Sequence, residues 1–179
     1  MRILFAALLL AFVASPTLAQ ERANDEARPS PNATVSQTIG TTIATVGYSR
    51  PSVRDRDIFG GLVPYGETWR TGANEATTIS LSGDVMVEGE MLPAGTYALF
   101  TVPTADSWTI IFNNTAEQWG AFNHDPSQDA LRVTVEPMTN APMQEQFEIR
   151  FANITEDSAT MILHWDTVGA PVQIMAHSM

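Results

Sequence analysis

The sequence predicts an all-β domain, either a single antiparallel β-sandwich or a jelly roll. About nine short runs rich in Val, Ile, Thr and aromatic residues follow one another, with turn residues at intervals of roughly 8–12 residues. No long segment has the periodicity of a helix, which a parallel α/β fold would need between its strands. The chain has 179 residues and is 44% hydrophobic, which suits one domain with a core.

Residues 1–19 have the features of a secretory signal peptide. Arg2 supplies the positive start, residues 3–13 form an apolar run, and Thr17-Leu18-Ala19 is a small-residue cleavage site. The apolar run is shorter than the roughly 20 residues that span a bilayer, so no transmembrane span is expected in the mature chain. We therefore expect an exported protein, periplasmic or extracellular, with an uncleaved anchor as the alternative.

The domain boundaries follow from composition. Residues 20–33 are polar, contain proline and lack periodicity, which predicts a flexible linker. The β-domain is expected over residues 34–175, and residues 176–179 are expected to form a frayed tail.

A hairpin is predicted around Gly40, because residues 35–39 and 42–48 are rich in Thr, Ile and Val. A long irregular crossing follows and ends at Asn74. Further strands are predicted at residues 77–81, 85–87, 96–102, 108–113, 131–136, 146–154, 160–165 and 172–175.

One short helix is predicted near residues 116–120. Thr115 and Gln118 have the spacing of a capping box, in which the threonine caps the N-terminus and the glutamine reaches back to it. The helix would end near Gly120.

The segment 48–78 is the most informative part of the chain. It holds four of the nine positive side chains, all of them arginine: Arg50, Arg54, Arg56 and Arg70. A long irregular segment inside a compact domain is often functional. Guanidinium groups gathered there could bind a carboxylate, sulfate or phosphate through paired hydrogen bonds.

The alternative is that these arginines are structural, because the chain is strongly acidic, with a formal net charge of −11. Each guanidinium group could pair with a nearby acid. The candidate pairs are Arg54 and Arg56 with Asp55 or Asp57, and Arg70 with Glu67 or Glu75.

Composition excludes several classes of function. The net charge of −11 argues against a nucleic-acid partner, which requires a basic face. The absence of lysine excludes Schiff-base chemistry and a P-loop. The absence of cysteine excludes disulfides, thiol catalysis and zinc–thiolate sites. No cofactor is expected.

A second set of candidate residues has the chemistry of sugar recognition. Trp69 and Trp119 offer flat rings for stacking, and Asn74 offers an amide for hydrogen bonds to hydroxyl groups. The alternative is that both tryptophans fill the core.

No catalytic residue is assigned, and an enzyme is not favoured. Glu75 is the one alternative, as a carboxylate of a glycan hydrolase, although it could equally be a structural partner of Arg70. His124, His164 and His177 lack the spacing of metal ligands, so no metal site is predicted and structural roles are expected.

The most distinctive segment is Trp69-Arg70-Thr71-Gly72-Ala73-Asn74-Glu75-Ala76-Thr77. Shorter characteristic pieces are Tyr48-Ser49-Arg50-Pro51, Ile58-Phe59-Gly60, Leu62-Val63-Pro64-Tyr65-Gly66, Leu92-Pro93-Ala94-Gly95-Thr96-Tyr97 and Gln118-Trp119-Gly120. With these segments the chain resembles the bacterial secreted family DUF2911, a domain of unknown function, over residues 34–175. The resemblance implies a fold and an exported protein, and no activity.

The chain departs from this family at Asp55, where the family usually has glycine. If that glycine serves a turn with positive φ, Asp55 must adopt the same conformation. Aspartate tolerates it better than most residues.

The leading hypothesis is a non-catalytic binding module for a carbohydrate or a small anion. Its ligand-binding residues would be Arg50, Arg56, Trp69, Arg70, Asn74 and Trp119. The alternatives are a hydrolase acting on envelope or extracellular glycans and a structural envelope protein without a small ligand. The oligomeric state is not predicted.

Overall fold

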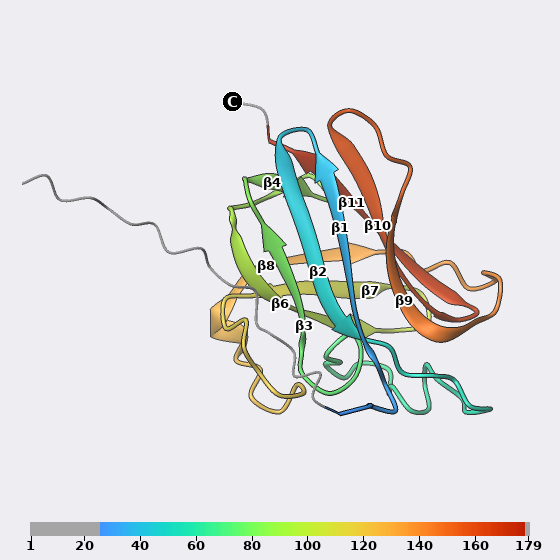
Figure 1. Ribbon diagram of the computed structural model, residues 1–179. Coiled ribbons are helices and arrows are strands. Elements are labelled where there is room, and N and C mark those ends of the chain that lie inside the picture. Colours follow the sequence, from blue (N-terminus) through green and yellow to red (C-terminus); the bar gives the residue numbers. More distant parts are fainter. Residues whose placement is uncertain (1–25, 178–179) are drawn as a thin grey trace, which may run out of the picture.

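The computed structural model describes residues 26–177 and shows two antiparallel sheets packed face to face (Figure 1). This arrangement confirms the predicted all-β sandwich. The predicted signal peptide, the first residues of the predicted linker and the last two residues of the predicted tail lie outside the described residues.

The first sheet has six strands in the order β1-β2-β3-β6-β7-β8. Their bounds are β1 Asn32–Ile39, β2 Thr42–Ser49, β3 Thr77–Leu81, β6 Gly95–Pro103, β7 Trp108–Asn113 and β8 Asp129–Val135. The second sheet has five strands in the order β5-β4-β11-β10-β9. Their bounds are β5 Glu90–Leu92, β4 Val85–Val87, β11 Val168–Ala176, β10 Ser158–Asp166 and β9 Gln144–Ala152. Neighbouring strands are antiparallel in both sheets.

The predicted hairpin between β1 and β2 turns at Gly40, whose φ is 57°. A Cβ at this position would lie 2.8 Å from the Cβ of Ala176, so only glycine fits both the conformation and the space. Strand β1 begins at Asn32, inside the stretch assigned to the linker. Strand β5 was not predicted, because Glu90 and Leu92 border turn residues that dominate this part of the sequence pattern.

The predicted helix near residues 116–120 is wrong. The helical turn in the described part of the chain is a 3-10 turn, Pro126–Gln128. The backbone of the predicted helix instead bonds to the segment before β3: Ala76 N–H donates to the Gln118 carbonyl, and Gly120 N–H donates to the Asn74 carbonyl. These tertiary hydrogen bonds replace the i→i−4 bonds that a helix would form. Within residues 26–177, no helix has the length and apolarity needed to cross a membrane.

The core lies between the two sheets and follows the alternation of side chains along the strands. In β10, for example, Met161, Leu163 and Trp165 point inward and are at most 1% exposed. Burial of such apolar surface, worth about 25 cal/mol per Å², is the main stabilising contribution to a sandwich of this kind. At one end the core becomes aromatic, where Trp69 and Phe147 join Trp165.

The 50–76 loop, which connects β2 to β3, closes this aromatic end of the sandwich (Figure 1). It reaches the second sheet through a bridge between Ser52 and Gln146 on β9, and returns to the first sheet through a bridge between Trp69 and Thr101 on β6. Buried apolar side chains anchor it: Val53, Ile58 and Val63. The loop thus contacts both sheets, and its polar side chains lie at the aromatic end of the sandwich.

Candidate functional site

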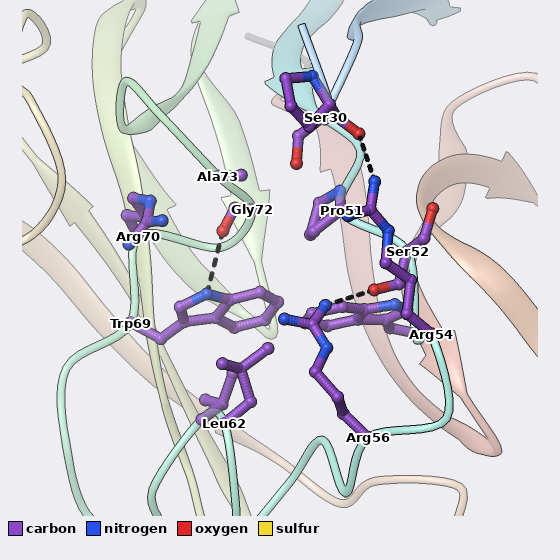
Figure 2. A pocket seen from close by; sticks show the side chains of 13 residues that line it. Ser30, Pro51, Ser52, Arg54, Arg56, Leu62, Trp69, Arg70, Gly72 and Ala73 are labelled. Atoms are coloured by element: carbon purple, nitrogen blue, oxygen red, sulfur yellow. Dashed lines mark hydrogen bonds between the residues drawn. The ribbon is translucent and has the colours of Figure 1, made fainter.

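A pocket of about 270 Å³ lies between the 50–76 loop and the end of β10 (Figure 2). Three of its lining residues are arginines: Arg54, Arg56 and Arg70. The other lining residues are Pro29, Ser30, Pro51, Ser52, Leu62, Val63, Trp69, Gly72, Ala73 and Trp165. None of them is acidic. We call this site the arginine pocket.

Arg54 and Arg56 reach the pocket from a turn with an unusual backbone. Arg54 and Asp55 have φ angles of 50° and 55°, so two consecutive non-glycine residues are left-handed. Asp55 therefore adopts the conformation expected if the family's glycine serves a turn with positive φ. Backbone carbonyls hold the guanidinium groups, since Arg56 Nε donates to Val53 O at 2.9 Å and Arg54 Nη2 to Pro29 O at 3.5 Å.

Neither of these two guanidinium groups forms an ion pair within residues 26–177. The acids next to them in the sequence, Asp55 and Asp57, are exposed and do not line the pocket. The hydrogen bonds to carbonyl groups orient both side chains without neutralising them. Both positive charges therefore remain available to a ligand.

Arg70 lies on the opposite side of the pocket from Arg54 and Arg56 (Figure 2). Its side chain is partly buried, and its Nε atom is buried without a hydrogen-bond partner in the described part of the chain. Burial lowers the pKa of the guanidinium group, because a charge is less stable away from water. Within the described residues neither Glu67 nor Glu75 pairs with it.

Trp69 and Trp165 form the aromatic side of the pocket. Their rings stack with centroids 5.8 Å apart and planes inclined by 16°. Trp69 is fixed by its backbone, which exchanges two hydrogen bonds with Thr101, and by its Nε1 atom, which donates to Gly72 O at 3.1 Å. Trp165 is only 1% exposed, and its Nε1 atom has no acceptor among residues 26–177.

Two N–H donors of the lining residues, Arg70 Nε and Trp165 Nε1, are buried without an acceptor among residues 26–177. Such groups are rare in folded proteins, because a buried donor without an acceptor costs about 1–3 kcal/mol. Both atoms are sealed from solvent, so a ligand in the pocket would meet the outer guanidinium nitrogens rather than these two donors. Gly72 also lines the pocket. Its φ is 149°, and a Cβ at this position would lie 2.9 Å from Ser49 O. This close approach keeps the segment 69–73 in place.

Residues 28–31, which we call the N-terminal strap, complete one wall of the pocket. Arg28 Nη1 lies 2.9 and 2.8 Å from the two carboxylate oxygens of Glu75. Asn74 Nδ2 donates to Ser30 O at 3.2 Å, and Arg50 N–H donates to Pro31 O at 2.9 Å. The strap is thus held against the family-like segment that follows Trp69, although these residues belong to the predicted linker.

The structure brings together half of the sequence-predicted ligand residues. Arg56, Trp69 and Arg70 line the pocket, whereas Arg50, Asn74 and Trp119 do not. Arg50 lies along β9, where its Nε donates to Phe147 O at 3.0 Å and its Nη2 is 3.9 Å from Glu148 Oε1. Asn74 holds the N-terminal strap. Trp119 is 59% exposed on the segment after β7.

Glu75, the alternative catalytic residue, is 9% exposed and is held by Arg28, outside the lining of the pocket. Sequence reasoning missed Trp165 as a pocket residue, because its place in an alternating strand also fits a core side chain. It missed Ser30 because the strap lacks any periodic pattern. Arg54 was recognised within the cluster but was not assigned to the ligand.

A second polar cluster, the Asp129 network, lies at the junction of β7 and β8. The Asp129 carboxylate, 5% exposed, accepts hydrogen bonds from Asn113 Nδ2 at 2.7 Å, His124 Nε2 at 2.9 Å and Arg132 Nε at 2.7 Å. Burial alone would raise the pKa of Asp129, but these hydrogen bonds outweigh it and lower the pKa. The His124 ring also packs on Phe100, with centroids 4.9 Å apart.

His124 therefore takes part in a saturated structural network. His164 is 7% exposed on β10, and its Nε2 atom has no partner. His177 follows the end of β11, where its N–H donates to Asp84 O at 3.1 Å. Among residues 26–177, no group of three or more His, Asp or Glu side chains is arranged to hold a metal ion.

Comparison with known proteins relates the chain to a protein family. Residues 30–174 match the family described as protein of unknown function (DUF2911). No curated protein and no solved structure matches the chain. The matched region contains the whole sandwich up to Ile174 on β11 and every lining residue of the arginine pocket except Pro29. A match over this much of the sequence shows that the chain belongs to the DUF2911 family.

Proposed function

We propose that the protein is an exported, non-catalytic binding protein that holds a small anion in the arginine pocket. The observation that carries the proposal is the partly buried Arg70 guanidinium group, which has no acidic partner in the described residues. Arg54 and Arg56 line the same pocket and form no ion pair with any residue between 26 and 177. The features of a signal peptide in residues 1–19 support export.

The charge balance of the chain strengthens this reasoning. The sequence has 20 acidic residues and nine arginines, so a carboxylate could have been placed beside each guanidinium group. Three arginines nevertheless share a pocket in which no described lining residue is acidic. An unpaired buried charge destabilises a fold, and a bound anion would remove that penalty. Arginine is also well suited to this role, because its planar group donates paired hydrogen bonds to carboxylates and other oxyanions.

The lining favours an anion over a neutral carbohydrate, the other ligand considered from the sequence. Sugar hydroxyl groups both donate and accept hydrogen bonds, and they require both kinds of partner. The described lining has three guanidinium donor groups against two hydroxyl groups, those of Ser30 and Ser52, and the amide of Asn74 is used by the N-terminal strap. Trp119, a candidate stacking ring, lies outside the pocket.

The lining also supports a non-catalytic role. General acid–base catalysis needs a titratable side chain within hydrogen-bond reach of the bound ligand. The lining residues that the structure describes include no Asp, Glu or His, and Glu75 is bonded to Arg28 outside the lining. These residues can bind an anion, and none of them is a group that would transfer protons to or from it.

Thermal unfolding of the purified protein with sulfate, phosphate, acetate and neutral sugars would test the proposal. A ligand at about 100 times its dissociation constant adds about 2.7 kcal/mol to the free energy of unfolding, which raises Tm by several degrees. We expect one or more anions to raise Tm and the neutral sugars to leave it unchanged.

The variant Arg70→Gln should abolish the anion effect. Arg150→Gln is the matched control, because it removes the same charge from an exposed position on β9, where Arg150 Nε lies 3.8 Å from Glu148 Oε2. An anion effect that is equal in both variants would reflect general charge screening and contradict the proposal. Stabilisation by a neutral sugar alone would contradict it as well.

A further inference from the structure

We infer that the arginine pocket selects a fully ionised tetrahedral oxyanion, a sulfate ester or a dianionic phosphate monoester, on a small organic body. This inference rests on the proposed anion-binding function and adds the chemical class of the ligand. It depends on the direction of the donors, the scarcity of free acceptors and the size of the pocket.

The charged donors of the pocket come from two sides. Arg54 and Arg56 come from the turn on one side, and Arg70 comes from the other side (Figure 2). A planar carboxylate has two oxygens, and one guanidinium group can bind both of them through two parallel hydrogen bonds. A sulfate or phosphate ester has three terminal oxygens that point in different directions. Donors on two sides of one pocket match this tetrahedral arrangement better than a planar one.

Three backbone acceptors around the pocket are already engaged. The carbonyl of Ser52 accepts from Arg56, that of Pro29 from Arg54, and that of Gly72 from Trp69. Among residues 26–177 no carboxylate lines the pocket, and the hydroxyl groups of Ser30 and Ser52 are the side-chain acceptors of the lining. An O–H group on the ligand would therefore meet few acceptors, and an unsatisfied buried polar group costs about 1–3 kcal/mol, or roughly 5- to 150-fold in affinity. The pocket thus discriminates against protonated oxyanions.

The size of the pocket indicates that the oxyanion carries a further group. A volume of about 270 Å³ is roughly nine times the 30 Å³ that one water molecule occupies in the liquid, and a bare sulfate would leave much of it unfilled. The remaining walls are largely apolar, with Pro51, Leu62, Val63 and the two indole rings. A compact ring or short apolar body attached to the oxyanion would fill this space.

Isothermal titration with three probes of matched body tests the inference: phenyl sulfate, phenyl phosphate and benzoate. At about pH 8 both esters should bind at least about tenfold more tightly than benzoate. Phenyl phosphate takes up a proton with a pKa of about 6, so its affinity should fall about tenfold at pH 5. Phenyl sulfate stays ionised, and its unchanged affinity would show that the protein itself is unaffected by the lower pH.

The variant Arg56→Gln should weaken both esters by about tenfold or more, whereas Arg150→Gln should not. The ratio of the two ester affinities at pH 8 would distinguish the two classes of ligand. Benzoate binding as tightly as the esters, or phenyl phosphate binding equally at both pH values, would overturn this inference and leave the anion-binding function standing. If none of the probes, and no inorganic anion or acetate, bound the protein, the proposed function itself would fail.

Discussion

The arginine pocket and the Asp129 network are polar clusters of opposite character within one sandwich. In the Asp129 network a single carboxylate meets three donors, from Asn113, His124 and Arg132. In the arginine pocket three guanidinium groups have no acidic partner within the described residues, and two buried N–H groups of the lining have no acceptor there. Each cluster lies beside a long loop, but only one of them is complete without a ligand.

The two clusters therefore illustrate two different roles of buried polar groups in a folded chain. A saturated network contributes to the free energy of folding, because every buried charge and donor is compensated. An unsaturated cluster opposes folding slightly and becomes favourable only when a ligand supplies the missing partner. Substitutions in the two clusters should therefore have opposite effects on stability and binding, and the following predictions test that expectation.

The largest effect is expected for Asp129→Ala. It removes the common acceptor of three side chains and should lower the free energy of unfolding by about 2–4 kcal/mol. Urea unfolding would measure this change. Asp106→Ala, at an exposed loop position, is the matched control and should change stability by at most about 0.5 kcal/mol. Similar effects of the two substitutions would contradict the role of the Asp129 network.

A smaller effect is expected from acid. The hydrogen bonds that outweigh burial hold the pKa of Asp129 below its ordinary value of 3.8. The stability that this carboxylate contributes is therefore fully present above pH 3.8, and it is lost as pH falls through the lower pKa of the folded state. Urea unfolding between about pH 5 and about pH 2 should show a shallower decline for Asp129→Asn than for the natural chain. Parallel declines would contradict this assignment.

The smallest effect on stability is expected for Arg70→Met. No partner in the described residues is lost, and the burial that lowers the pKa of this guanidinium group no longer opposes folding. The free energy of unfolding should stay within about 1 kcal/mol of the natural value or rise. Arg132→Met makes the same chemical change in the Asp129 network and should destabilise the protein more. The reverse order in urea unfolding would mean that Arg70 is structural.

The strands of the sandwich could largely be predicted, because one buried face and one exposed face impose a period of two on the sequence. The short helix near residues 116–120 was predicted wrongly, since the capping pattern of Thr115 and Gln118 is only a local signal. In the structure the Gln118 side chain donates to Thr115 O at 2.6 Å and to Asn113 Oδ1 at 3.2 Å, while the backbone bonds to another segment. Tertiary hydrogen bonds therefore overrode the local preference.

The candidate site was only partly predictable for a related reason. The arginines stood out, because positive side chains are scarce in this acidic chain and cluster in one irregular segment. Whether each of them is paired depends on distances that the sequence does not contain. Glu75 was a plausible partner of Arg70, yet Arg28 binds it from the N-terminal strap, 47 positions away. Trp165 likewise enters the pocket only because β10 ends there.

The stacked tryptophans beside the pocket have an optical consequence. Of the four tryptophans, Trp69, Trp108 and Trp165 are at most 7% exposed and lie in one aromatic cluster, whereas Trp119 is 59% exposed. The cluster should emit at shorter wavelength than the hydrated Trp119, and its rings are close enough to exchange excitation energy. An oxyanion placed against Trp165 would perturb the emission of the whole cluster. With Trp119 replaced by phenylalanine, the protein would report the occupancy of its own pocket by fluorescence, without any attached dye.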